Sequence, residues 1–301
     1  MYSRLTIGLP VYNGAEYISE ALDSILSQSF NDFSVVISDN GSTDGTEIIC
    51  RNYEMRDTRI RYYRETINRG ATWNYNRVFE LSDSQYFKWA AHDDKCSSTF
   101  FERCINALDQ NPDVVLSYPR TAIIDKYSQF SNYYPDELDF LNLDLFERYR
   151  CYLRLYRIPR SCNPIFGVMR SDILAQTPLI GNFIASDMIL LAELILRGPI
   201  MEIPEYLFFR RDHEKASIRA HPSYQDRIAW FDPTKKGRVQ LSRWRWLEEF
   251  HRSIRRVPMK KWQNLRCHSY LAEWAFWNIP GLFKDIIKAI LWPVLKNKRT
   301  S

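Results

Sequence analysis

The chain has 301 residues, of which 45% are hydrophobic and 26% charged. This length and balance exclude a small disulfide-stapled protein, a disordered chain and a collagen-like repeat. The net charge of +5 is unevenly distributed, because residues 210–301 carry 21 Lys and Arg against 8 Asp and Glu, whereas residues 1–209 carry 20 against 28. A basic C-terminal region of this kind suits phosphates, nucleic acid or anionic lipid.

The first part of the chain alternates short apolar segments with amphipathic ones. Strands are predicted at residues 5–10, 33–38, 60–64, 86–90 and 114–118, and helices at 16–27, 46–55, 73–81 and from about 99 onward. Thr99 and Glu102 have the spacing of a capping box at the start of the last of these helices. The alternation predicts a doubly wound, mostly parallel α/β sheet with helices on both faces.

The later part of the chain is less regular. Residues 119–164 read as an insertion, with a polar aromatic loop at 127–135 and a helix at 145–156. Residues 166–170, a helix at 188–197 and apolar segments at 200–204 and 207–211 then complete the α/β part. Residues 221–237, with two prolines and a glycine, resemble a linker. The predicted domains are therefore 1–215 and a basic, mainly helical region at 216–301.

Two features bear on the cellular compartment. The first apolar segment begins at Leu5 without a preceding signal peptide, which favours the cytoplasm. The six cysteines form no CxxC pair, so we expect buried free thiols rather than zinc ligands or disulfides.

Polar residues follow three of the predicted strands, at the sheet edge where open parallel sheets bind ligands. The first strand is followed by Tyr12 and Asn13, and the second runs into the segment DNGSTDG at 39–45, which alone would fit a turn and a helix N-cap. Asp93 and Asp94 follow an apolar strand, and adjacent like charges repel each other unless a cation or ligand hydroxyls lie between them. This pair predicts metal or ribose binding, with a solvated turn as the alternative.

As a set, the first strand, residues 39–46 and the Asp93-Asp94 pair resemble glycosyltransferase family 2, over about residues 4–215. The resemblance implies the GT-A form of the Rossmann-like fold, a nucleotide-diphospho-sugar donor, a divalent Mn²⁺ or Mg²⁺ ion and transfer with inversion to an acceptor hydroxyl. It places Pro10, Tyr12 and Asn13 at the nucleotide, with Asp39 accepting from a ring N–H of the base. A uracil, thymine or guanine fits such a carboxylate; a UDP-sugar is favoured.

The same resemblance assigns further roles around the nucleotide. Arg69, in the segment Asn68-Arg69-Gly70, would contact the base or a phosphate. Asp93 would bind the ribose, and Asp94 would hold the metal that bridges to the diphosphate. Many relatives carry an acid two positions before Asp93, whereas this chain has Ala91.

The acceptor side is expected downstream. Residues 163–167 resemble the acceptor-side loop of the family, with Gly167 as its glycine, and Ser186-Asp187 stands where the family has its acidic catalytic motif. An inverting displacement needs one carboxylate to take the proton of the acceptor hydroxyl, so Asp187 is the predicted general base. The alternative is an acid at a helix N-terminus. Glu193 on the same helix is interpreted as a solvated or structural acid.

Basic residues follow the last predicted core segment. Arg210 and Arg211 would bind the diphosphate as planar donors, and His213 would be a metal ligand or a phosphate donor, as the resemblance implies. A surface or core histidine is the alternative for His213.

The C-terminal region allows several functions. Apolar residues between 282 and 295 recur along one side of a helix with lysines beside them, a pattern that fits a helix lying on an anionic membrane or one docked on the core. Pro293 and the charges argue against a spanning helix. The Arg- and Trp-rich segment 243–256 could stack on nucleic acid or sugars, or lie among lipid headgroups.

These observations favour a cytoplasmic glycosyltransferase, peripheral on the inner membrane face, that acts on a glycan or a lipid-linked glycan. A nucleotide-sugar-binding protein without turnover is the first alternative, because of Ala91. A nucleic-acid- or membrane-binding module built on the basic region is the second, although the acidic mouth of the α/β part argues against nucleic acid. A retaining transferase or a hydrolase with the same donor is the third.

Overall fold

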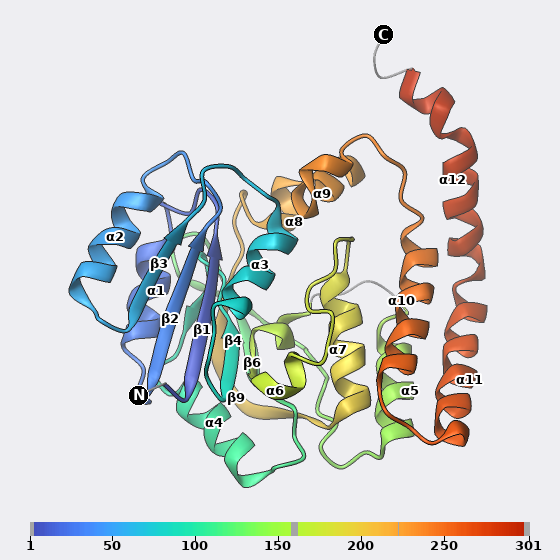
Figure 1. Cartoon of the computed structure of the whole chain (residues 1–301), viewed down its shortest axis with the longest axis horizontal. Coiled ribbons are helices and arrows are strands. Elements are labelled where there is room, and N and C mark those ends of the chain that lie inside the picture. The colour runs from blue at the N-terminus through green and yellow to red at the C-terminus, as the bar shows by residue number, and fades with distance from the viewer. Residues whose placement is uncertain (1–2, 158–161, 222, 298–301) are drawn as a thin grey trace.

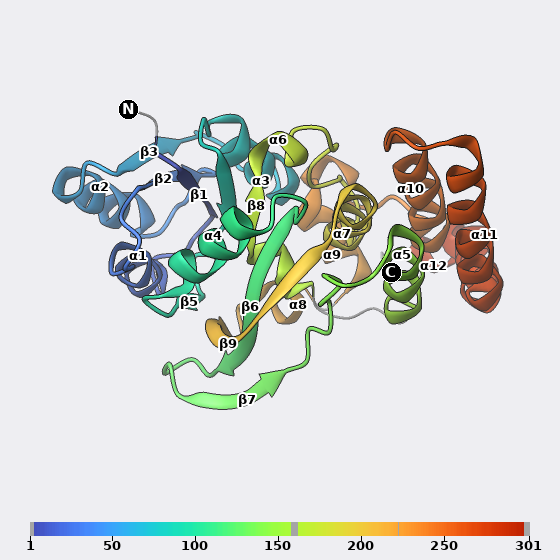
Figure 2. The same cartoon turned by 90° about the horizontal axis from the view of Figure 1, so that it is seen from below.

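A single mixed sheet organises the chain (Figures 1 and 2). The computed structural model describes residues 3–157, 162–221 and 223–297. Strands follow the order β3-β2-β1-β4-β8-β6-β9-β5, and β7 pairs with β6 outside this path. The strands are β1 (Leu5–Val11), β2 (Phe33–Asp39), β3 (Ile60–Arg64), β4 (Tyr86–Trp89), β5 (Lys95–Cys96), β6 (Leu116–Ile124), β7 (Phe130–Tyr134), β8 (Val168–Arg170) and β9 (Ile200–Arg211).

Helices cover both faces of this sheet. One hydrophobic cluster joins the strands to α1, α2 and α4, and a second joins them to α3, α5, α6 and α7. The helices of the core are α1 (Ile18–Leu26), α2 (Thr46–Arg56), α3 (Ala71–Glu80), α4 (Phe100–Gln110), α5 (Leu145–Leu155), the short α6 (Ser171–Leu174) and α7 (Ser186–Arg197), with the 3-10 turn η1 at Asn163–Phe166.

The parallel part of the sheet forms from the alternating first half of the sequence. β1 pairs in parallel with β2 and β4, and β2 pairs in parallel with β3. Gly8 lies in the middle of β1, where a Cβ atom would come within 2.7 Å of the Val78 and Phe87 side chains. The absence of a side chain at this position therefore lets α3 pack directly on β1. The expected mostly parallel α/β fold with a helical C-terminal region is confirmed.

Three predicted segments differ from the structure because tertiary pairing overrides local sequence. The expected polar loop at 127–135 contains β7, which pairs antiparallel with β6. The two expected apolar segments at 200–211 form one strand, β9, and its register with β6 shifts around Arg120. The expected linker at 221–237 contains α9 (Tyr224–Phe231) and the turn η2 (Pro233–Lys235).

The start of α4 also differs from the prediction. Thr99 makes no side-chain capping bond, so the predicted capping box is absent. The N–H of Phe101 donates to Gln28 Oε1 at 3.0 Å, and Glu102 accepts from Ser29 Oγ at 2.7 Å. A loop distant in sequence therefore caps the helix, and local spacing could not indicate this.

The C-terminal helices pack against the core through α7 and α5. They are α8 (Ser217–Ala220), α9, α10 (Ser242–Arg256), α11 (Lys261–Trp277) and α12 (Ile279–Asn297). Trp246 of α10 is buried and donates from Nε1 to the carbonyl of Ile184 at 2.8 Å, just before α7. In the described ranges no helix is long and apolar enough to cross a membrane.

The cysteines are free thiols, as predicted, but they are not uniformly buried. Cys50, Cys104, Cys162 and Cys267 lie in the interior, Cys96 is partly exposed and Cys151 is exposed.

Candidate active site

The carboxyl ends of β1 and β2 are joined by hydrogen bonds between their loops. The N–H of Asn13 donates to Ser42 Oγ at 2.9 Å, and Asn13 Oδ1 accepts from the Thr43 N–H at 2.8 Å. Asn13 has φ 54°, a left-handed conformation that asparagine tolerates better than most residues. Pro10 is buried within β1, whereas the Tyr12 side chain is 43% exposed. Of these residues, Tyr12 therefore presents a surface to a ligand, and Asn13 shapes the loop.

Asp39 is buried beneath this loop. Its Oδ1 accepts from the Ser42 N–H at 2.8 Å, and its Oδ2 accepts from the Tyr62 hydroxyl at 2.7 Å. The carboxylate has no exposed surface. In this structure Asp39 fixes the turn after β2, and the base contact expected from the sequence would require the loop to open. Tyr62 was not indicated by the sequence.

Arg69 lies on an exposed loop that the end of β2 holds in place. Asn40 Oδ1 accepts from the Arg69 N–H at 2.9 Å, and Asn40 Nδ2 donates to the Asn68 side chain at 2.9 Å. The Arg69 guanidinium lies 4.5 Å from the centre of the Trp73 ring at the start of α3. This stacked pair presents a flat, positively charged surface beside the β1 and β2 loops.

Asp93 and Asp94 follow β4 and meet the end of β9. Asp93 Oδ2 lies 2.9 Å from His213 Nε2, and Asp94 Oδ1 accepts from the Arg211 N–H at 2.8 Å. Although burial opposes ionisation of Asp93, the charges of His92 and His213 and the His213 hydrogen bond lower its pKa. Burial and the neighbouring Asp93 raise the pKa of Asp94. The two adjacent acids therefore differ in their affinity for protons.

The Arg211 side chain is fully buried and serves as a scaffold. Nε donates to the Asp93 carbonyl at 2.8 Å, Nη1 donates to Ser128 Oγ at 3.0 Å, and Nη2 pairs with Glu20 at 3.0 Å. Because these donors are directed to protein acceptors, the structure does not place Arg211 at a diphosphate as the sequence predicted. His213 likewise contacts Asp93 rather than Asp94, and its ring packs edge-on against Tyr17.

Arg210 precedes Arg211 on β9 and makes different contacts. Its charge lowers the pKa of both Asp94 and Asp187, which places it within electrostatic range of both. Arg210 Nη1 donates to Asn163 Oδ1 at 3.2 Å, and Asn163 Nδ2 donates to Asp136 Oδ1 at 2.9 Å. Asn163 and Asp136 are buried, and burial raises the pKa of Asp136 to about 6. This chain of contacts orients Arg210, and the sequence did not indicate Asp136.

Gly167 follows η1 on the predicted acceptor-side loop. A Cβ atom at this position would lie 2.5 Å from the carbonyl oxygen of Ser117 on β6. Glycine is therefore required here for close backbone approach, which positions the loop that carries Asn163.

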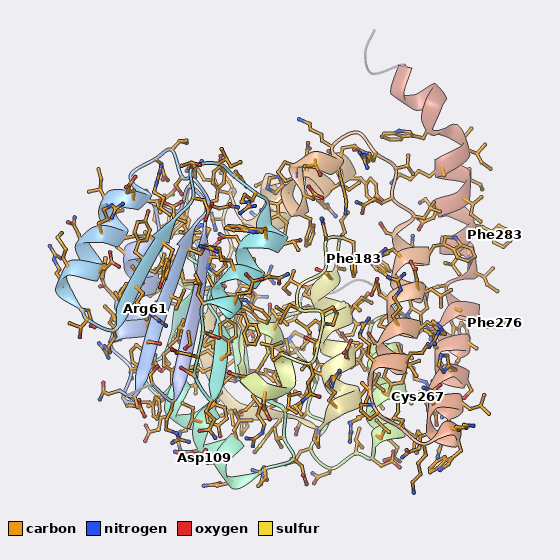
Figure 3. The ribbon with its side chains drawn as sticks, in the orientation of Figure 1. Arg61, Asp109, Phe183, Cys267, Phe276 and Phe283 are labelled. Atoms are coloured by element: carbon orange, nitrogen blue, oxygen red, sulfur yellow. The ribbon has the colours of Figure 1, made fainter. Side chains whose placement is uncertain are left out.

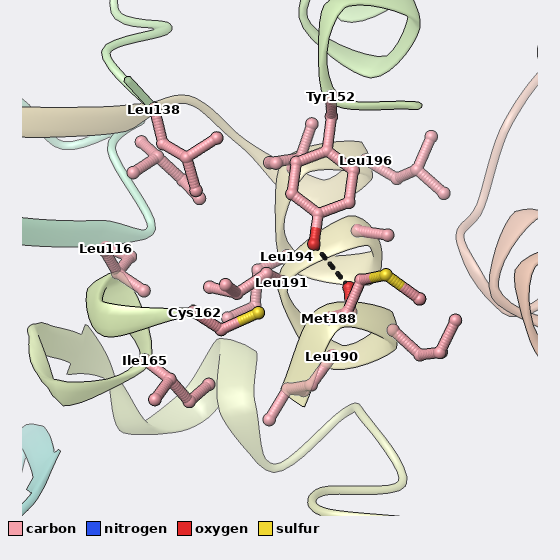
Figure 4. Packing of buried hydrophobic residues seen from close by; sticks show 14 of the residues in the cluster. Leu116, Leu138, Tyr152, Cys162, Ile165, Met188, Leu190, Leu191, Leu194 and Leu196 are labelled. Carbon is pink, nitrogen blue, oxygen red and sulfur yellow. Dashed lines mark hydrogen bonds between the residues drawn. The ribbon is translucent and has the colours of Figure 1, made fainter. Parts of the chain in front are cut away.

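Asp187 lies in the first turn of α7. Burial raises its pKa, while hydrogen bonds from the Met188 N–H and the Cys162 side chain lower it in part. Ala185, which directly precedes α7, has φ 62°, an unusual conformation for a residue with a side chain. Figure 4 shows the Tyr152 hydroxyl donating to the Met188 carbonyl, at 2.5 Å, among the packed side chains of this helix. The start of α7 is thus held rigidly beside Asp187.

Tyr75 of α3 connects the two groups of acids. Burial raises the pKa of its hydroxyl, and the negative charges of Asp93, Asp94 and Asp187 raise it further. The Trp89 Nε1–H donates to the Tyr75 carbonyl at 2.9 Å, which fixes the residue against β4. All three carboxylates therefore act electrostatically on this one hydroxyl. Nothing in the local sequence distinguishes Tyr75 from an ordinary core tyrosine.

Glu193 is a structural acid, as one of its two interpretations held. It is 1% exposed and pairs with Arg197 at 2.9 Å and with Arg256 of α10 at 2.7 Å. It is not solvated, and it takes no part in the candidate site.

The open α/β sheet carries an exposed aromatic and an arginine at one loop cluster, adjacent acids after β4 and a buried carboxylate in the first turn of α7. These are the parts of a nucleotide-sugar transferase of the GT-A class. Residues 6–174 match glycosyl transferase family 2, which is more than half of the chain, and the chain belongs to this family.

Curated relatives agree with this assignment. An uncharacterised glycosyltransferase of Rickettsia typhi is 36% identical over 130 residues, which are 42% of this chain and 39% of the relative. The glycosyltransferase GlyG of Streptococcus pneumoniae is 26% identical over 117 residues, 38% of this chain and 39% of that protein. The chain thus matches about two fifths of the length of these relatives.

Solved structures share the fold over nearly the whole chain. TarS of S. aureus, residues 1–349 with UDP, aligns with a TM-score of 0.58 at 14% identity and covers 95% of this chain and 90% of that one. The mannosyltransferase PcManGT of Pyrobaculum calidifontis, with GDP-Man and Mn²⁺, aligns with a TM-score of 0.53 at 15% identity and covers 96% and 88%. At these identities the likeness concerns the fold.

Proposed function

We propose that this glycosyltransferase moves a sugar, with inversion, from a nucleotide-diphospho-sugar to a hydroxyl of a glycan or lipid-linked glycan. The observation that carries the proposal is the shared neighbourhood of Asp187 and the Asp93-Asp94 pair, which both lie within electrostatic range of Tyr75 and Arg210. The acids proposed for the donor and the acid proposed for the acceptor therefore share two electrostatic neighbours, Tyr75 and Arg210. The transferase unit would be residues 1–215, with 216–301 as its helical support.

On the donor side, Tyr12 and the Arg69–Trp73 pair would contact the nucleotide, with Pro10 and Asn13 shaping their loop and Asp39 fixing the turn beside it. Asp93 would accept from the ribose hydroxyls, with His213 orienting its carboxylate. Arg210 would bind the diphosphate. We favour a UDP-sugar; TarS, which shares the fold, binds UDP, and PcManGT, which shares it as well, binds GDP-Man.

The acids after β4 fit a divalent metal in their chemistry. Carboxylate oxygens are the ligands that Mg²⁺ and Mn²⁺ prefer, and such ions are commonly held by one or two carboxylates together with substrate phosphates. No complete cluster of three or more His, Cys, Asp or Glu occurs among the residues that the structure describes, so a metal held by Asp94 would share its coordination with the donor. Such an ion supplies charge stabilisation for the leaving diphosphate.

Asp187 would act as the general base. A buried carboxylate with a raised pKa takes a proton more readily than an exposed one, which suits removal of the acceptor's proton as its oxygen attacks the anomeric carbon. The bond to the diphosphate breaks on the opposite face. Gly167 and the loop at 163–167 would border the acceptor.

The first test is binding of UDP, GDP, dTDP and CMP, each with and without Mn²⁺, measured as a shift in the unfolding midpoint. A metal-dependent shift with one diphosphate supports the donor site, and the absence of any shift contradicts it. The second test is D187N, which should retain the nucleotide shift while release of nucleotide from the matching sugar donor falls about 10²–10⁴-fold. The control is D172N, at an exposed acid of α6.

The stereochemistry needs its own measurement. NMR of the first product formed from an α-linked donor should show a β-linkage. An α-linkage would assign the chain to a retaining mechanism. We also propose a cytoplasmic location, peripheral on the inner membrane face.

A further inference from the structure

The last helix of the described chain turns its polar side toward the protein. Asp285 of α12 is buried and accepts from the Arg243 N–H at 2.7 Å. The Trp244 Nε1–H donates to the Leu282 carbonyl at 3.1 Å, and Lys288 Nζ lies 3.0 Å from the centre of the Tyr224 ring. Polar contacts therefore hold much of the inner side of α12 against α10 and α9.

The outer side of α12 is apolar. Its exposed apolar residues recur at the spacing of one helix face and continue the exposed Phe276 of α11; we call this set the outer stripe: Phe276, Ile279, Phe283, Ile286, Ile287, Ile290 and Leu291. Their exposed fractions run from 36% to 70%. Figure 3 shows Phe276 and Phe283 on the same outer side of the molecule.

This arrangement reverses the usual one. A surface helix of a globular protein normally directs its apolar stripe into the core and its charges outward. An exposed apolar set of this extent marks an interaction surface. The helix is docked on α10 and α11, with Leu282 buried, but the outer stripe itself faces away from this contact.

Charge identifies the partner. The exposed Lys284 borders the outer stripe, and residues 210–301 carry 21 basic against 8 acidic residues, whereas residues 1–209 carry 20 against 28. An acidic surface therefore attracts the C-terminal region and repels the rest. The stripe lies on α12 and the end of α11, and these two helices form a column at the end of the molecule away from α2 (Figure 1). An exposed row of this kind suits a planar layer better than it suits a peptide, which needs a groove.

We propose that the outer stripe inserts into the headgroup region of an anionic phospholipid surface, with Lys284 against the lipid phosphates. This deepens the proposed peripheral location and needs no sugar donor, so it can succeed or fail independently of the transfer reaction.

The test is flotation of the full chain with phosphatidylglycerol–phosphatidylcholine vesicles and with phosphatidylcholine vesicles alone. The wild type should float with the anionic vesicles at least about tenfold more than with the neutral ones. F283S/I290S should lose at least about tenfold of this binding, because both residues are exposed and neither supports the fold. The matched control is I48S/M55S, two equally exposed apolar residues on α2, which should float like the wild type.

Two results would overturn the proposal. One is a wild type that stays at the bottom of the gradient with both vesicles; a dimer by light scattering that F283S/I290S converts to monomer would then assign the stripe to a second copy. The other is F283S/I290S floating with the anionic vesicles to the same extent as I48S/M55S. The UDP-induced shift of the unfolding midpoint, measured on the same preparations, reports the donor site separately.

Discussion

Arg256 of α10 holds the buried carboxylate of Glu193 on α7, with Nη2 and Nε at 2.7 and 2.9 Å from the same oxygen. The contact joins the basic C-terminal region to the helix that carries Asp187. The sequence allowed the Arg- and Trp-rich segment 243–256 as a nucleic-acid surface. In the structure, Arg256 and Trp246 of this segment make contacts inside the protein instead.

We expect R256A to lower the free energy of unfolding by about 2–4 kcal/mol, because it leaves Glu193 buried with Arg197 as its remaining ion-pair partner among the described residues. Urea denaturation measures this. R255A, at the exposed neighbouring position, should change the value by less than about 0.5 kcal/mol. Equal effects of the two variants would contradict the structural role of the pair.

The capping of α4 gives a second prediction. Q28A should lower the free energy of unfolding by about 1–3 kcal/mol, because the buried N–H of Phe101 loses the side-chain oxygen to which it donates. T99A, which removes the residue that the sequence indicated as the cap, should cost less than about 0.5 kcal/mol. The reverse order in thermal or urea unfolding would restore the sequence-based interpretation.

The pH dependence of transfer should report Asp187. Its pKa is raised by burial and the base is active when deprotonated, so kcat/KM should be lost as pH falls, at a pH above that expected for an ordinary aspartate. The profile is measured with the sugar donor that the binding experiment identifies. An acid limb at the position of an exposed carboxyl would argue against Asp187 as the base.

Tyr75 should matter for chemistry more than for folding. Y75F keeps the ring and removes the hydroxyl whose pKa the three acids raise, and we expect kcat/KM to fall about 10-fold because a polar group near all three carboxylates is lost. Y53F removes a hydroxyl that donates to Asp23 at 2.6 Å on α1 and serves as the control. A fall of the same size in Y53F would point to a general effect on the fold.

Asn163 should position Arg210 for the donor. N163A is expected to raise the KM for the donor, and a double-mutant cycle with R210A should give a coupling of about 1–2 kcal/mol in kcat/KM. Additive effects would show that Asn163 supports the loop without positioning the arginine.

The sequence predicts those elements that form from local interactions, and it misses those that form through contacts with distant segments. The alternation from β1 to α4 and the helix α5 depend on local periodicity, and these predictions hold. The strand β7 depends on pairing with β6, and its polar aromatic sequence by itself favours a loop.

The same reasoning applies to the site. Asp93, Asp94 and Asp187 were identified because they follow strands or begin helices in a familiar pattern. Tyr75 and Asp136 are positioned by packing between distant segments, and Arg211 differs from its neighbour Arg210 only through the side of β9 on which it lies.

Arg211 also sets the order in which the site can assemble during synthesis. Its side chain joins α1, the segment after β4 and the turn between β6 and β7, through Glu20, Asp93 and Ser128. The ribosome therefore adds both acids well before the arginine that anchors them. The arrangement of Asp93 and Asp94 therefore depends on the pairing of β9 with β6, and a chain that ended before β9 would lack the arginine that holds it.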